Sequence, residues 1–235
     1  MMKRLLKRLR TALVARADRV LSTIPEDSGA VVLHDTEAIH QVVRKGDVIL
    51  IEGRERLSQL IRLFTLSTWS HSVLYIGDAA LKGDPEQKRQ LIDKFGDQAD
   101  KLVVEALIGG VVLSPLAKYD GYNVRICRPR DVAARDLETV LHSALSDLGK
   151  QYDRRNILHL ALQLLPLRFG PFKKLSTEIC LGACSEFQVI CSGSIARAFQ
   201  RVGVLVRSAP IGSYHPSWIT PRDFDLSPNF EIIKA

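Results

Sequence analysis

Apolar and polar positions follow two different periods along this chain, and these periods predict both strands and helices. Short, mainly apolar runs bounded by turn residues, such as 48–53 and 102–107, are typical of buried strands. Apolar residues three and four apart, as in 56–66 and 132–148, predict amphipathic helices instead. Because short strands are mixed with helices, the pattern favours an α+β domain with antiparallel strands.

The other expected elements follow from the same periods. A strand or short helix is expected within 31–43, and the charged excursion over 78–101 is expected to be solvated and helical around 86–95. Further strands are predicted at 73–76, 111–113, 123–128, 204–207 and 230–233, and a further helix is predicted from Ser185 or Cys191 to Val202. The run 157–169 is unusually apolar but too short to span a bilayer, so a core or lid helix broken at Pro166 is predicted there.

The beginning of the chain combines an apolar helical face with a basic one. Residues 1–21 hold seven Lys or Arg side chains and one acidic residue, Asp18, so they carry +6 of the +7 net charge of the chain. Such a helix suits an anionic membrane surface, and a helix packed on its own domain or a solvated arm is the alternative. We therefore predict a basic amphipathic helix over 1–24 and one globular domain over 25–235.

The composition narrows the function classes. A hydrophobic fraction of 46% and a charged fraction of 25% over 235 residues are typical of one domain with a sizeable core. Without residues 1–21 the net charge is only about +1, and no nucleic-acid-binding motif is present, so no nucleic-acid partner is expected. No apolar secretory core of about 7 to 15 residues follows the basic start, which predicts a cytoplasmic location, or a peripheral one on a membrane. The cysteines, Cys127, Cys180, Cys184 and Cys191, are then expected to be free thiols, and their spacing lacks the C-x-x-C pair of a zinc site.

Two residues are candidates for thiol chemistry, Cys191 at the start of a predicted helix and His71 at the start of a predicted strand. A helix N-terminus and a nearby imidazolium both lower the pKa of a cysteine, and the backbone N–H groups of Cys191 and Ser192 would point toward a developing oxyanion. Glu105 interrupts an apolar strand, and a buried carboxylate needs a partner, so it is the candidate that orients the imidazole. The same residues also fit a buried structural thiol, an ordinary strand histidine and an outward-facing glutamate. His215 is the competing histidine.

Several short motifs occur in a definite order between about residues 45 and 225. They are Gly46-Asp47, the strand Ser70–Gly77, Glu105-Ala106 followed by Gly110-Val111, Gly149 with Tyr152-Asp153, Cys191-Ser192 and Thr220-Pro221. In this order the histidine precedes the cysteine, whereas the cysteine comes first in papain-like enzymes. The joint pattern resembles the permuted NlpC-like papain-fold cysteine hydrolases, often called YiiX/YebB-like.

The resemblance implies a circularly permuted papain-like α+β fold, with an antiparallel sheet or small barrel packed on helices. It also implies a cysteine hydrolase, either an amidase or peptidase or an acyl hydrolase or acyltransferase, that forms a thioacyl intermediate and needs no metal or other cofactor. Cys191 would attack the carbonyl carbon, His71 would accept and return the proton, and Glu105 would orient His71. Tyr152 and Ser192 are expected to contact the substrate.

Departures from the family pattern leave alternatives open. The family usually has Glu after its Cys-Ser, whereas Gly193 stands there in this chain and Cys184-Ser185-Glu186 carries the tripeptide, so Cys184 is the competing nucleophile. We prefer Cys191 because an apolar run precedes it and a helical face follows. The apolar run 157–169 and the basic residues 1–21 favour a lipid or acyl substrate at a membrane surface. A catalytically idle binding module, or an adaptor recruited to a membrane, is the non-enzymatic alternative on the same fold.

Overall fold

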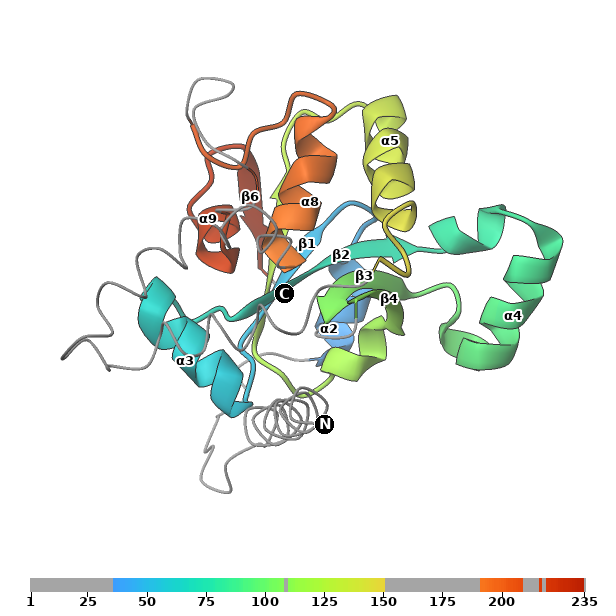
Figure 1. Cartoon of the computed structure of the whole chain (residues 1–235), viewed down its shortest axis with the longest axis horizontal. Helices are drawn as coiled ribbons and strands as arrows, with labels where there is room; N and C mark the ends of the chain where they lie inside the picture. Colours follow the sequence, from blue (N-terminus) through green and yellow to red (C-terminus); the bar gives the residue numbers. More distant parts are fainter. Residues whose placement is uncertain (1–35, 108–109, 151–190, 209–215, 217–218, 235) are drawn as a thin grey trace, which may run out of the picture.

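The computed structural model of the chain describes residues 36–107, 110–150, 191–208, 216 and 219–234 (Figure 1). Its centre is one six-stranded sheet in the order β4-β3-β2-β1-β5-β6, in which every neighbouring pair is antiparallel. The strands are β1 (Val48–Ile51), β2 (His71–Gly77), β3 (Leu102–Leu107), β4 (Gly110–Pro115), β5 (Val124–Pro129) and β6 (Phe230–Ile233). The α+β fold is therefore confirmed. In the described part of the chain β4 and β6 form the two edges of an open sheet, and not the closing pair of a barrel.

Helices cover both faces of this sheet (Figure 1). One face packs against α5 (Ala134–Leu145), α8 (Cys191–Gln200) and α9 (Pro221–Asp225). The other packs against α2 (Thr36–Val42) and the 3₁₀ helix η3 (Leu116–Tyr119). Between β1 and β2 lies α3 (Arg56–Thr65), and between β2 and β3 lie η1 (Ala79–Lys82), α4 (Pro85–Phe95) and η2 (Gly96–Gln98). All the helices predicted within the described residues are thus present.

The alternation of side chains along the strands divides the core into two layers. In β2, Leu74 and Ile76 point to the layer of α8, where Phe199 is fully buried. Val73, which directly precedes Leu74, points to the opposite layer and packs with Ile39 of α2 and Tyr119 of η3. Because successive strand residues face opposite sides, His71 must share the face of Val73, whereas Ser72 faces α8.

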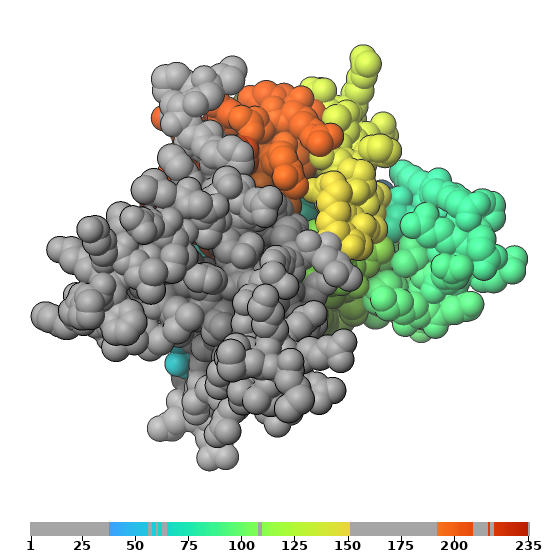
Figure 2. Space-filling model, in the orientation of Figure 1, coloured from blue at the N-terminus to red at the C-terminus, as the bar shows by residue number. Residues whose placement is uncertain are grey.

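The predicted solvated excursion over 78–101 forms a lobe at one side of the molecule, around α4 (Figure 2). Its sequence explains why the helix begins where it does. Asp84 caps the helix by accepting hydrogen bonds from the backbone N–H groups of Glu86 and Gln87, both at 3.1 Å, and Pro85 occupies the first helical position. Only Leu91 of this helix is buried, which accounts for its highly charged sequence.

The Gly46-Asp47 motif has a structural function in this fold. Gly46 has a φ of +91°, and a Cβ built there would lie 2.2 Å from Cδ1 of Leu137, so the turn accepts only glycine without rearrangement. The side chain of Asp47, 1% exposed, accepts hydrogen bonds from Nε and Nη2 of Arg128 at 2.9 and 2.8 Å. This buried pair joins β1 to β5 and fixes the start of the central strand.

The prediction of a strand at 204–207 is wrong. The chain turns after α8, and the backbone N–H of Val204 donates to the carbonyl of Phe199 at 3.1 Å, so it satisfies the end of the helix and not a strand. Val206 is apolar because it fills the core, where it is 1% exposed. This apolar run therefore reflects burial and not pairing in the sheet.

Some expectations fall on parts of the chain that the structure does not describe. These are the basic helix over 1–24 with its domain boundary, and the apolar run 157–169. They stay predictions from the sequence. Within the described ranges, no helix has the length and apolar character needed to cross a membrane.

Candidate active site

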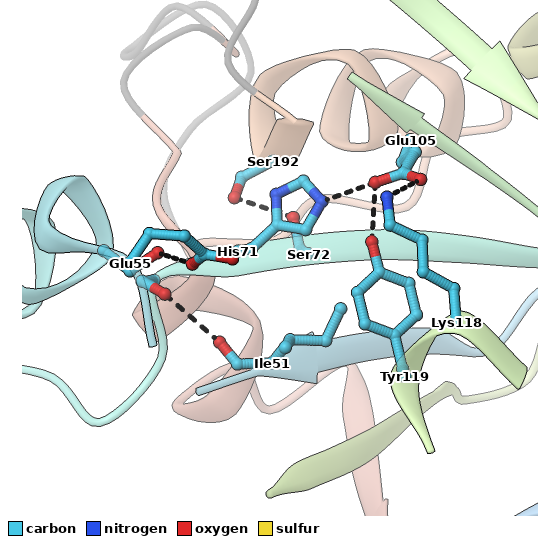
Figure 3. Close-up of polar contacts among 10 residues, drawn as sticks. Ile51, Glu55, His71, Ser72, Glu105, Lys118, Tyr119 and Ser192 are labelled. Carbon is cyan, nitrogen blue, oxygen red and sulfur yellow. Dashed lines mark hydrogen bonds and ion pairs between the residues drawn. The ribbon is translucent and has the colours of Figure 1, made fainter. Parts of the chain in front are cut away.

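The sheet brings His71 and Glu105 together. The pairing of β2 with β3 places Leu74 opposite Val104, and continuing this register by one residue places Val73 opposite Glu105. His71 is two residues from Val73, so it is the diagonal neighbour of Glu105 on the same face. Its Nε2 lies 3.2 Å from Oε2 of Glu105 (Figure 3). Two residues that are distant in sequence thus form a direct contact at the beginning of β2.

Glu105 is surrounded by donors. Its side chain is 0% exposed, and η3 supplies two hydrogen bonds to it (Figure 3). Nζ of Lys118 donates to Oε1 at 2.5 Å, and the hydroxyl of Tyr119 donates to Oε2 at 2.6 Å. Each carboxylate oxygen therefore has a charged or hydroxyl partner, which removes most of the cost of burying the charge.

These donors decide the protonation state of the carboxylate. Burial raises the pKa of this carboxyl, but the hydrogen bond and charge of His71 and hydrogen bonds from Lys118 and Ser114 lower it to about 2. At neutral pH Glu105 is therefore ionised and can only accept hydrogen bonds. It follows that Nε2 of His71 carries the proton in their contact.

The first turn of α8 contacts the strand at the residue after His71. The hydroxyls of Ser72 and Ser192 hydrogen-bond at 2.9 Å, and both residues are 0% exposed. Cys191 is the first residue of α8. In Figure 3 the second ring nitrogen of His71, Nδ1, faces the side on which Ser192 and the start of α8 lie. That the Cys191 sulfur lies within hydrogen-bond reach of His71 stays a prediction.

An aromatic row continues from the histidine along the same face. The rings of His71 and Tyr119 have centroids 6.3 Å apart, and Tyr119 meets Tyr122 edge to face at 5.9 Å. The guanidinium of Arg54 lies 4.8 Å above the Tyr122 ring and donates to the carbonyl of Gly121. The loops after β1 and η3 are thereby joined beside the site.

The late Thr220-Pro221 motif begins a helix that contacts the chain just before His71. Thr220 donates to the Asp223 carboxylate through its backbone N–H at 2.7 Å and its hydroxyl at 2.8 Å, which begins α9. Asp225, at the end of α9, accepts from the indole N–H of Trp69 at 3.1 Å. Because Trp69 lies two residues before His71, α9 helps to fix the chain that leads into the histidine.

The structure places the predicted site residues as follows. His71 and Glu105 are in contact, Cys191 opens α8, and the Ser192 side chain is buried against Ser72, so that only its backbone N–H is a candidate for the predicted substrate contact. The roles of all four in catalysis stay predictions. Tyr152, Cys180, Cys184 and His215 lie outside the described residues. Cys127 is fully buried, and burial raises the pKa of its thiol to about 12.

Sequence reasoning did not identify Lys118 and Tyr119. The only signal was indirect, because a glutamate in the middle of an apolar strand requires donors, and nothing in the pattern says which side chains supply them. The expectation that the site needs no metal stays a prediction. Among the residues that the structure describes, no cluster of three or more His, Cys, Asp or Glu side chains could hold a metal ion.

Comparison with known proteins adds a family. A model of the permuted papain-like amidase enzymes, the YaeF/YiiX or C92 family, matches residues 42–159. Among solved structures, that of the metalloprotein yiiX from Escherichia coli O157:H7 aligns with a TM-score of 0.49 and 18% identity, over 81% of this chain and 96% of that one. A search of curated proteins finds no match. The matched residues include both His71 and Glu105.

Proposed function

Because this chain belongs to the family of permuted papain-like amidases, we propose that it hydrolyses amide bonds through a Cys191–His71–Glu105 triad. The observation that supports this best is the contact between His71 and the ionised, buried Glu105. The hydrogen bond between Ser72 and Ser192 adds to it, since it brings the first turn of α8 to the strand that carries the histidine.

The proton on Nε2 of His71 determines how the ring can act. Since the Glu105 carboxylate only accepts, the neutral ring keeps its proton on Nε2 and presents a lone pair on Nδ1. We expect Nδ1 to take the thiol proton of Cys191. The resulting imidazolium is stabilised by the Glu105 charge 3.2 Å away, and the thiolate by the imidazolium and the N-terminus of α8.

The reaction then proceeds in two stages. The thiolate of Cys191 attacks the carbonyl carbon, so that a C–S bond forms and the carbonyl electron pair moves to oxygen, where backbone N–H groups at the start of α8 stabilise it. The C–N bond breaks as the His71 imidazolium gives its proton to the leaving amine, which leaves a thioacyl intermediate. His71 next takes a proton from water as the water oxygen attacks the thioester carbon. The C–S bond then breaks, the acid product is released, and His71 returns the proton to the departing thiolate of Cys191.

Membership of an amidase family implies an amide-containing substrate. The choice among peptidase, acyl hydrolase and acyltransferase depends on residues beyond the proposed triad. The sequence features that favour an acyl substrate are the run 157–169 and the basic residues 1–21, both outside the described residues. For the described site, hydrolysis of an amide is the simplest chemistry. The idle binding module differs from it in one measurable property, because it needs no reactive thiol.

The test is the reactivity of each cysteine toward iodoacetamide at about pH 6, where ordinary thiols are protonated, with the modified residue identified by peptide mass mapping. We expect Cys191 to react fastest and Cys127 to react only in the unfolded protein. His71→Ala should abolish the preference for Cys191. Cys191→Ala should also prevent formation of the acyl-enzyme with p-nitrophenyl acetate, an activated acyl donor.

Cys184→Ala is the matched control, because it removes a thiol from a second Cys-Ser pair of the same chain. It should leave both the alkylation of Cys191 and the acyl-enzyme unchanged. If Cys184 reacts first and its loss removes the acyl-enzyme, the nucleophile is Cys184. If no cysteine is more reactive than a free thiol, the proposed hydrolase is wrong and the binding module is the better interpretation.

A further inference from the structure

We infer that Lys118 and Tyr119 are positioning residues, which hold the Glu105 carboxylate charged and oriented toward His71. The inference rests on the proposed function, since it assigns two further residues to the same site. Neither residue belongs to a motif that the sequence resemblance uses. The structure brings them to the site through η3, which follows the edge strand β4 directly.

The carboxylate is held at both oxygens. Lys118 binds Oε1 at 2.5 Å, whereas Tyr119 and His71 share Oε2 at 2.6 and 3.2 Å. A carboxylate with donors on both oxygens cannot rotate about its last bond without breaking one of them. The two η3 side chains therefore fix the plane of the carboxylate, and with it the direction in which His71 must donate.

The turn that carries these donors is itself anchored on both sides. Tyr119 is 8% exposed and packs edge to face on Tyr122. Next to it, Asp120 hydrogen-bonds Nε2 of His40 from α2 at 2.9 Å, and the carbonyl of Gly121 accepts from Arg54. Contacts from α2 and from the loop after β1 therefore restrain the segment that follows Tyr119, which keeps its hydroxyl at a fixed place.

The charge of Lys118 also stabilises the ionised form of Glu105. The charged or titratable groups that contact Glu105 among the described residues are His71 of β2 and Lys118 and Tyr119 of η3. The Lys118 side chain is 38% exposed, so it brings a solvated cation to a carboxylate that is 0% exposed. Burial raises the pKa of Glu105 and the hydrogen bond from Lys118 is one of the contacts that lower it, so loss of this cation raises the pKa of Glu105. A protonated Glu105 no longer favours the imidazolium.

The experiment measures the alkylation rate of Cys191 by iodoacetamide against pH, together with the melting temperature. In Lys118→Met, the acid side of the rate profile should move to higher pH by about one unit, which slows the reaction roughly tenfold at about pH 5. Lys118→Arg should restore the original profile, because it keeps the charge. Lys88→Met, at an exposed lysine of α4, is the matched control and should change nothing.

The outcomes separate the two proposals. If Cys191 of the unaltered protein is not unusually reactive, the proposed function fails. If it is reactive and folded Lys118→Met keeps the original profile, only the positioning role is overturned. Should Lys118→Met not fold, Tyr119→Phe decides the question, because it removes one hydroxyl donor to Glu105 and leaves the ring in place. A displaced acid limb in Tyr119→Phe supports the inference, and an unchanged one contradicts it.

Discussion

Glu105 could be predicted from the sequence as a candidate site residue, whereas the donors that surround its carboxylate could not. A charge inside an apolar strand must either face water or meet donors, and this one is 1% exposed. The alternative of an ordinary outward-facing glutamate therefore does not hold. Its partners come from three different segments, β2, β4 and η3, and no local pattern joins them. Only the tertiary fold reveals that Lys118 and Tyr119 donate hydrogen bonds to the Glu105 carboxylate.

The lowered pKa of Glu105 predicts a specific dependence of stability on pH. A fall from 4.5 to about 2 contributes about 3 kcal/mol to the free energy of unfolding above pH 4.5, and this contribution is lost as pH falls from 4.5 toward 2. We expect Glu105→Gln to lower the unfolding free energy by about that amount near neutral pH. The penalty should shrink at lower pH, because Glu105 of the unaltered protein is then also neutral.

Urea denaturation of both proteins at several pH values between about 3 and 7 measures this difference. Glu86→Gln, at an exposed site on α4, is the control and should show no such dependence. A penalty that stays constant over the whole range would show that the loss comes from altered packing and not from ionisation.

At the scale of elements, the predicted strands and helices agree best with the structure where the spacing of apolar side chains alone determines the element type. The run 48–53 and the helical pattern 56–66 became β1 and α3, because continuous apolar residues and a one-sided apolar face admit few other solutions. The run 204–207 shows the limit of this reasoning. Its residues are apolar and buried, but the end of α8 uses the N–H of Val204, and local patterning cannot show that competition.

The contact between α8 and β2 also depends on a pair that sequence could not identify. Ser72 and Ser192 are 120 residues apart and meet in the core. Removing one hydroxyl leaves the other buried without its partner, so Ser72→Ala and Ser192→Ala should each lower the unfolding free energy by about 1 to 3 kcal/mol. The double variant should cost clearly less than the sum of the two, because both polar groups are then absent.

Denaturant unfolding of the four proteins gives this coupling energy directly. Ser143→Ala, at a buried serine of α5, serves as a third position that should add to either change without coupling. Strict additivity of Ser72→Ala and Ser192→Ala would mean that the hydrogen bond does not hold α8 on the sheet.

For the whole molecule, the distribution of charge separates two parts of the chain. Residues 1–21 carry +6 of the net +7, so the remainder is close to neutral. Within the described part, most buried charges are neutralised in place, as Asp47 is by Arg128 and Asp147 is by Arg197, both at 2.8 Å. The family match covers residues 42–159 and the strands of the sheet lie between residues 48 and 233, so neither includes the basic beginning of the chain.

We therefore predict that residues 1–21 bind anionic membranes. The full chain should bind vesicles that contain phosphatidylglycerol, and binding should weaken as salt rises. Reversal of four basic residues to Glu should lower the affinity by at least about a hundredfold, since each basic side chain near an anionic surface contributes about 1 kcal/mol. The substituted residues are Lys3, Arg4, Lys7 and Arg8.

Co-sedimentation with vesicles checks this, and the lobe around α4 offers a control of equal charge. Reversal of its exposed residues Lys82, Lys88, Arg89 and Lys94 changes the net charge of the molecule by the same amount. If binding depends on the segment 1–21, only the first variant loses it, because an amphipathic helix needs its basic face beside the lipid. Equal losses in the two variants would mean that net charge alone attracts the protein to the membrane. Equal retention would mean that the basic segment is not the membrane contact, and both results contradict the prediction. We expect the alkylation rate of Cys191 to be the same in both variants, because the predicted membrane contact and the proposed triad use different residues.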